Sequence, residues 1–146
     1  VIAFEPSPRN VLLLEKNLRL NDITNVQIMS VCIGDKNSTV FFDSNDDSST
    51  GRISSQGQIE VKMVRLDTLI LKGILPRPDV IKIDVEGAEL LALKGALKTL
   101  NNYHPKILLS THSSLLNKQC SEFLRSEKYK VISLDRREIL AMPITP

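Results

Sequence analysis

Three acidic residues follow an apolar segment in the middle of the chain. Asp84 comes directly after the run Val-Ile-Lys-Ile at 80–83, and Glu86 and Glu89 follow closely. In open parallel α/β sheets, ligands bind outside the carboxyl ends of the strands. We therefore expect Asp84 and Glu86 to lie at a functional edge of a sheet. The alternative is that the glutamates only complement the positive end of a helix. It explains Glu89 comfortably, but it explains Asp84 less well.

Glu5 repeats this arrangement near the start of the chain, because it follows the apolar residues 1–4 and precedes a helical pattern. In dinucleotide-binding folds, an acidic residue at the end of the second strand accepts hydrogen bonds from ribose hydroxyls. Glu5 is thus a candidate ribose ligand, although a strand-end acid without a ligand is an equally simple explanation. The glycine-rich loop that precedes such a strand is not found, since the first glycine is Gly34.

Composition excludes several classes of protein. The chain has 146 residues, 42% hydrophobic and 25% charged, which fits one ordinary globular domain. A net charge of +2 gives no support for nucleic-acid binding. No apolar run approaches the roughly 18 residues of a membrane span, and no signal peptide is visible. Cys32 and Cys120 match neither a disulfide framework nor a metal-ligand spacing, so we expect a reducing, cytoplasmic environment.

Hydrophobic periodicity predicts alternating strands and helices. We expect strands at 1–5, 26–33, 39–42, 59–66, 80–85, 106–110, 130–134 and 138–142, and helices at 8–20, 68–73, 90–100 and 117–128. Ser7 and Asp67 are placed to cap the first two helices. The strand at 80–85 should be buried on both faces, and the polar segment 43–58 should be a loop. The fold class is therefore α/β, a mostly parallel doubly wound sheet with an antiparallel hairpin at its C-terminal edge.

The motifs together resemble the FkbM family of S-adenosylmethionine-dependent methyltransferases. The matching features are Phe4-Glu5-Pro6, Asn17, Asn21, Leu66-Asp67, the string Lys-Ile-Asp-Val-Glu-Gly-Ala-Glu at 82–89, and Gly95-Ala96. The resemblance covers roughly residues 1–112 and implies the class I methyltransferase fold. The strand order of that fold is 3-2-1-4-5-7-6, with strand 7 antiparallel. Because the chain starts inside a strand pattern, we expect residues 1–146 to be a partial domain from strand 2 onward. Strand 1 and its glycine loop would then lie upstream, and the fragment alone would be inactive.

The resemblance also implies roles for individual residues. Glu5 would bind the ribose of S-adenosylmethionine, with Cys32 and Ile33 beside the adenine. Asp84 would lie between cofactor and acceptor, and Glu86 would orient or deprotonate the acceptor. Apart from the resemblance, the polar loop that contains Ser49 and Arg52 is a candidate to reach over the acceptor, with Arg52 contacting an anionic or hydroxyl-rich group. A flexible loop without such a role is the alternative.

His112 follows the strand at 106–110 and is a second candidate base, because imidazole titrates near neutral pH. A structural role for this histidine is the alternative. Family members commonly carry a glutamate two residues before it. Here that position is Ser110, which argues against an acid–histidine pair.

The function that this pattern predicts is methyl transfer to a hydroxyl of a sugar, glycolipid or natural product. Such a displacement needs alignment of the reactants and a base for the acceptor hydroxyl. A non-catalytic remnant or binding module with the same fold is the alternative. A nicotinamide-dependent dehydrogenase would use Glu5 equally well, but it does not account for the acidic string after residue 83. Metal dependence through Asp84, Glu86 and His112 is left open by the sequence, but nothing fixes a coordination geometry, so no metal ligands are assigned.

Overall fold

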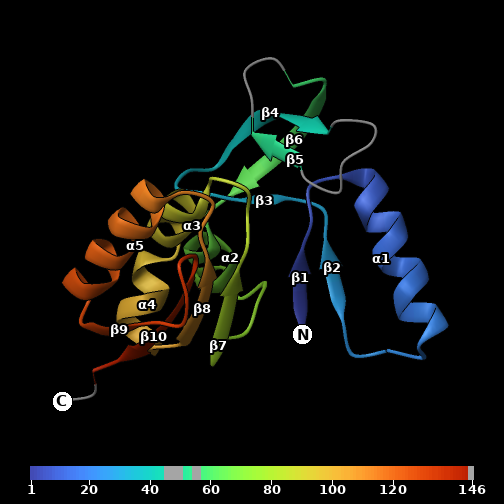
Figure 1. The fold of residues 1–146 in the computed structure, drawn as a ribbon. Coiled ribbons are helices and arrows are strands. Elements are labelled where there is room, and N and C mark those ends of the chain that lie inside the picture. The colour runs from blue at the N-terminus through green and yellow to red at the C-terminus, as the bar shows by residue number, and fades with distance from the viewer. Residues whose placement is uncertain (45–50, 54–56, 145–146) are drawn as a thin grey trace.

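The chain contains both strands and helices, and a run of consecutive strands separates the first two helices (Figure 1). The computed structural model describes residues 1–44, 51–53 and 57–144, with only the backbone described at 43–44 and 51–53. The strands are β1 (Ile2–Phe4), β2 (Gln27–Met29), β3 (Cys32–Ile33), β4 (Ser38–Ser44), β5 (Gly51–Ile53), β6 (Ile59–Val64), β7 (Val80–Ile83), β8 (Lys106–Ser110), β9 (Tyr129–Ser133) and β10 (Glu138–Pro143). The helices are α1 (Pro8–Leu20), α2 (Leu66–Leu71), α3 (Glu89–Gly95), α4 (Leu97–Tyr103) and α5 (Ser114–Ser126).

The described strands form three sheets. β1 and β2 are a parallel pair, and the main sheet has the order β7-β8-β10-β9. In the main sheet β7 and β8 are parallel, whereas β10 runs antiparallel to both of its neighbours. This is the expected 4-5-7-6 order with strand 7 reversed, and β2-β1 corresponds to 3-2. The third sheet, β3-β6-β4-β5, lies across the ends of the others (Figure 1).

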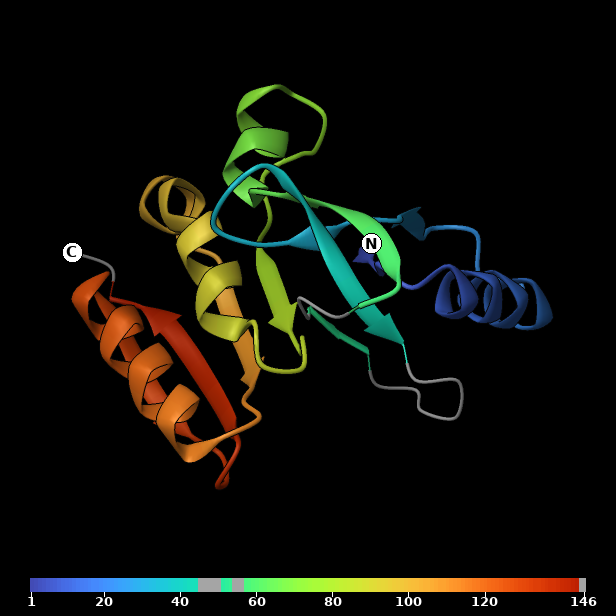
Figure 2. The ribbon, with the colours of Figure 1, turned by 90° about the horizontal axis from the view of Figure 1, so that it is seen from above.

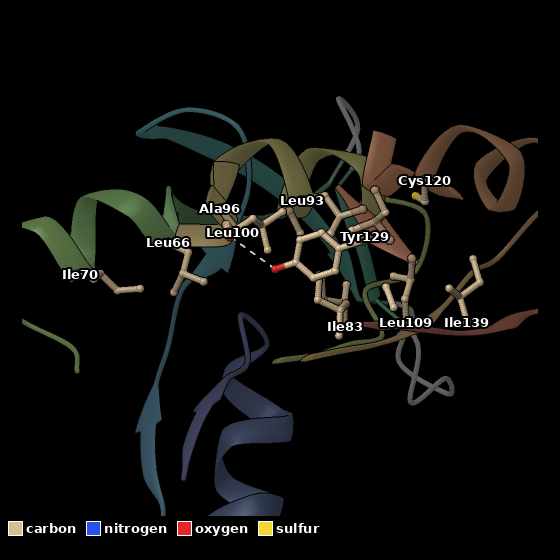
Figure 3. Packing of buried hydrophobic residues seen from close by; sticks show 14 of the residues in the cluster. Leu66, Ile70, Ile83, Leu93, Ala96, Leu100, Leu109, Cys120, Tyr129 and Ile139 are labelled. Carbon is tan, nitrogen blue, oxygen red and sulfur yellow. Dashed lines mark hydrogen bonds between the residues drawn. The ribbon is translucent and has the colours of Figure 1, made fainter. Parts of the chain in front are cut away.

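The core lies between the main sheet and the helices α3, α4 and α5, which cover one of its faces (Figures 2 and 3). Tyr129 fills the centre, and its hydroxyl donates a hydrogen bond of 3.4 Å to the carbonyl oxygen of Leu100. Burial raises the pKa of this phenol to about 12. The expectation that the strand after residue 79 is buried on both faces is wrong. Val80 is 63% exposed and Ile83 is 6% exposed, because alternate side chains of β7 point to opposite faces and only one face is covered.

Helix α1 begins and ends where the sequence predicts. The Ser7 hydroxyl accepts a hydrogen bond from the Asn10 amide, and Pro8 occupies the first helical position. The helix has no buried residue, however, and Leu12 and Leu20 are 65% and 70% exposed. Its apolar stripe is therefore not covered by the described part of the chain.

Asp67 caps a different helix from the one predicted. It lies inside α2, while its carboxylate accepts hydrogen bonds from the amides of Lys98 and Thr99 and from the Thr99 hydroxyl. These donors belong to the first turn of α4, so Asp67 satisfies backbone groups that the helix leaves free. The predicted helix 90–100 is in fact two helices, α3 and α4, which meet at Ala96.

Three further expectations need correction. The strand predicted at 26–33 is interrupted, and its second part, β3, leaves β2 to pair with β6. Part of the predicted loop 43–58 forms β5, which pairs with β4. Helix α5 begins three residues earlier than expected, because the Ser113 hydroxyl accepts a hydrogen bond from the Leu116 amide. Among the described helices, none is long and apolar enough to cross a membrane.

Candidate active site

The parallel pairing of β7 and β8 brings two predicted site residues together. Ile83 is in register with Leu109, so the residues that follow both strands emerge at the same edge of the sheet. Asp84 follows β7 directly and His112 lies two residues beyond β8. The distance between His112 Nε2 and Asp84 Oδ1 is 3.7 Å. The predicted placement of Asp84 and His112 on one edge is thus confirmed.

The turn after β7 brings Glu86 to the same imidazole. Glu86 and Gly87 have positive φ angles of 37° and 95°. This backbone region suits glycine but is sparsely populated by other residues, and it occurs often at functional sites. The turn leaves Glu86 Oε2 3.3 Å from His112 Nε2. Two carboxylates therefore face the same ring nitrogen.

Glu89 holds the other side of the ring. Its side chain is 0% exposed, and its Oε1 lies 2.6 Å from His112 Nδ1. The same oxygen accepts a hydrogen bond of 2.9 Å from the Gly87 amide. The interpretation of Glu89 as a mere complement to a helix dipole missed this contact. The available signal was its position at the start of a helix, three residues after Glu86 and following a sharp glycine turn.

The argument from Ser110 against an acid–histidine pair is also wrong, because Glu89 forms such a pair with His112. The acid comes from the start of α3, not from position 110. The Ser110 hydroxyl instead donates a hydrogen bond of 2.8 Å to Glu138 Oε1 on the neighbouring strand β10. The partner of His112 is thus 23 residues away in sequence and adjacent only in the fold.

The ammonium group of Lys82 partly offsets the negative charge of Asp84 at this edge of the sheet. Lys82 Nζ lies 3.0 Å from Asp84 Oδ2, but both side chains are about half exposed, so the ion pair contributes little stability. Among the described residues, no group of three or more His, Cys, Asp or Glu side chains is arranged to hold a metal ion. The arrangement can accept and orient a proton through the imidazole and its carboxylates.

Glu5 and Cys32 form a second small cluster. β1 and β7 run in the same direction and end toward the same side of the molecule (Figure 1). Glu5 Oε1 accepts a hydrogen bond of 2.8 Å from the Ser7 amide. Burial, and secondarily the charge of Glu5, raises the pKa of the Cys32 thiol to about 11. The thiol is therefore protonated at neutral pH and lies within electrostatic reach of Glu5. The half-buried Ile33 packs against the main core.

A close backbone contact fixes β3 against α3. A Cβ atom at Gly95 would lie 1.9 Å from the carbonyl oxygen of Gly34, so only glycine fits there. Arg65 strengthens the contact, because its guanidinium donates to the carbonyl oxygens of Asp35 and Lys94 and to the carboxylate of Asp67. This network ties the end of the segment that carries Cys32 to the helix that carries Glu89.

The two predicted acceptor contacts are not tested by this geometry. Ser49 lies outside the described residues. Arg52 lies in β5, where only the backbone is described.

Comparison with known proteins identifies the family. The model of the methyltransferase FkbM domain matches residues 1–131. The chain belongs to the FkbM methyltransferase family. A relative is the hexuronic acid methyltransferase AglP of Haloferax volcanii, 28% identical in an alignment 145 residues long that covers 94% of this chain and 59% of AglP.

The fold agrees with a solved member of the FkbM family. The crystal structure of methyltransferase FkbM from Methylobacillus flagellatus matches with a TM-score of 0.70 and 23% identity, over 97% of this chain and 36% of that chain. The chain thus spans less than two thirds of the relatives it matches. The α/β class and the Rossmann-like methyltransferase fold are confirmed, and membership of a methyltransferase family favours methyl transfer over the dehydrogenase alternative.

Proposed function

We propose that this chain carries the acceptor edge and part of the cofactor site of an S-adenosylmethionine-dependent O-methyltransferase that acts on a sugar hydroxyl. The observation that carries the proposal is the imidazole of His112. Its Nδ1 is held by the buried Glu89, and its Nε2 faces Asp84 and Glu86. A base with this geometry suits the deprotonation of a weakly acidic hydroxyl.

Glu5 and Cys32 are the residues that fit the cofactor. A carboxylate at the end of β1 offers oxygen acceptors for two vicinal ribose hydroxyls, and charge-assisted bonds of this kind are strong. The protonated thiol of Cys32 adds no competing charge beside Glu5. S-adenosylmethionine, when bound, supplies a methyl group on a positively charged sulfur. The acidic edge formed by Asp84 and Glu86 is electrostatically compatible with that charge.

The remaining residues act on the acceptor. Its hydroxyl donates a hydrogen bond to His112 Nε2, which takes up the proton, while Asp84 and Glu86 accept hydrogen bonds from neighbouring hydroxyls of the sugar and so orient it. The acceptor oxygen forms a bond to the methyl carbon, while the electron pair of the broken carbon–sulfur bond stays on sulfur. The protein supplies alignment and a proton acceptor, the two contributions that an in-line displacement needs.

A sugar acceptor is supported by the name of the relative AglP, a hexuronic acid methyltransferase. A hexuronic acid offers two kinds of oxygen, hydroxyl and carboxylate. The carboxylate is already ionised at neutral pH and needs no base. Carboxylates at the edge would also repel it, since like charges are costly at short range. We therefore favour a hydroxyl as the methylated group.

Calorimetric titration of the intact protein with S-adenosylhomocysteine tests the cofactor site. We expect Glu5→Ala to weaken binding about 10- to 100-fold, the equivalent of losing a pair of charge-assisted hydrogen bonds. The matched control is Glu15→Ala, which removes an exposed acid from α1 and should leave the affinity unchanged. If wild type does not bind, the chain is a non-catalytic module of this fold.

Alkali treatment of the methylated product tests the acceptor group. The assay supplies a hexuronic acid glycoside and, in parallel, the corresponding neutral hexoside. We expect a base-stable ether in both cases. A product that alkali hydrolyses is a methyl ester, and it would overturn the hydroxyl assignment while leaving methyl transfer intact.

A further inference from the structure

We propose that Glu89 is the positioning residue of this site: it holds His112 with the proton on Nδ1, so that Nε2 presents a lone pair to the acceptor. The inference rests on the proposed function in taking His112 as the base. Its structural part, the tautomer of the ring, can be tested without any activity. The contact that carries it is the 2.6 Å distance between Glu89 Oε1 and His112 Nδ1.

The burial of Glu89 exceeds what a helix terminus requires. An exposed acid in the first turn of α3 would complement the helix dipole equally well. Glu89 is instead fully buried, and its Oε2 has no hydrogen-bond partner among the described residues. Burying a carboxylate with an unpartnered oxygen is unfavourable. A compensating role for the other oxygen explains why the group is there, and Oε1 binds the imidazole.

Among the described groups near Glu89, the imidazole of His112 is the one that can share a proton with its carboxylate. Gly87 contributes a neutral amide to Oε1. From α5, Cys120 is a neutral neighbour, because burial and the charge of Glu89 raise the pKa of its thiol to about 12. Lys82 is bound to Asp84 on the exposed side of the edge.

The bond orients the ring as well as its proton. With Nδ1 turned inward to Glu89, Nε2 points to the opposite side, where Glu86 Oε2 at 3.3 Å and Asp84 Oδ1 at 3.7 Å are competing acceptors for a proton on Nε2. The shorter contact of 2.6 Å to Glu89 keeps the proton of the neutral ring on Nδ1. When Nε2 takes up the acceptor proton, the carboxylate of Glu89 compensates the charge of the imidazolium. An Nε2-protonated neutral ring could not accept that proton, so the tautomer decides whether the base is competent.

The chain contains an internal reference for this test, because its only other histidine is the exposed His104. Long-range ¹H–¹⁵N spectra of the histidine-labelled protein distinguish the two tautomers, and a His104→Gln variant assigns the signals. In wild type, at a pH where both rings are neutral, we expect the Nδ1-protonated form for His112. His104 should show the Nε2-protonated form that prevails in water. A solvent-like spectrum for His112 in wild type overturns the inference, and this reading does not depend on any Glu89 variant folding.

Two variants extend the test to turnover. Glu89→Leu should convert the His112 spectrum to that of His104. Glu89→Gln, which keeps an oxygen acceptor but removes the charge, should lower kcat about 100-fold while the affinity for S-adenosylhomocysteine is unchanged. The control is Glu138→Gln, which alters the nearby acid that Ser110 contacts and should change neither reading.

These outcomes separate the inference from the proposed function. If the tautomer is as expected but wild type transfers no methyl group, the proposed function fails and the positioning role of Glu89 stands. If methyl transfer occurs but Glu89→Gln retains full kcat, Glu89 is not a positioning residue.

Discussion

The same sequence pattern, an apolar strand followed by an acid and a helix, occurs at β1 and at β7 with different results. At β1, Glu5 binds the amide of Ser7 two residues later, and the helix that follows buries no side chain. At β7, the turn and the first residue of α3 surround a histidine that comes from another strand. An acid at a strand end therefore acquires a specific partner only where a neighbouring strand supplies one.

The largest expected effect separates turnover from binding. We expect His112→Gln to reduce methyl transfer about 10²- to 10⁴-fold, since this is what a general base contributes. The affinity for S-adenosylhomocysteine should stay within about twofold, because the proposed cofactor residues lie at β1 and β3. Single-turnover kinetics and calorimetry measure the two quantities. If His112→Gln also loses affinity for S-adenosylhomocysteine, then proton transfer and cofactor binding do not belong to separate regions of the molecule.

The second effect concerns the free energy of unfolding, through the cap that Asp67 provides to α4 in the core beside β7. We expect Asp67→Ala to lower the free energy of unfolding by about 3 kcal/mol, because it leaves buried donors of α4 and Arg65 without their acceptor. Urea denaturation followed by circular dichroism measures the change. The control is Asp79→Ala, an exposed acid just before β7, which should change stability by less than about 0.5 kcal/mol. Equal effects in both variants would show that the capping contact is not a specific source of stability.

The smallest effect tests the contact between Glu5 and Cys32. The charge of Glu5 disfavours the thiolate, so Glu5→Gln should lower the pKa of Cys32 slightly from about 11. Burial, the larger cause, should still hold it above the ordinary value. Thiolate absorbance during an alkaline titration of a Cys120→Ser background gives the pKa. An unchanged value would place Glu5 too far from Cys32 for both to contact one cofactor.

Local signals in the sequence predicted the elements that depend on neighbouring residues. The Ser7-Pro8 pair marked the start of α1 to the residue, and apolar periodicity located β8 and the hairpin β9–β10. The order of the strands came from the resemblance to a family, since periodicity alone does not specify which strands are adjacent.

Contacts between distant residues account for what the sequence did not predict. The sequence predicted that Asp67 caps its own helix, but its carboxylate accepts a hydrogen bond from the amide of Thr99, 32 residues away. Glu89 appeared to serve only a helix end, because nothing near it in sequence indicates His112. The sequence also did not predict that only one face of β7 is buried. Val80 and Ile83 are both apolar, and only the packing of the helices buries one and leaves the other exposed.

The close approach of Gly95 to Gly34 has a consequence for how this domain can diversify. At this point main chain meets main chain, with no space for a Cβ atom. The spacing between β3 and α3 is therefore set by contact of main chain with main chain, and the Arg65 guanidinium bridges the same two segments. A larger residue at position 95 would push β3 away from α3 and so change the separation of Cys32 and Glu89. This domain can therefore diversify around the contact only where residue 95 stays glycine, since glycine there keeps Cys32 and Glu89 at a fixed separation.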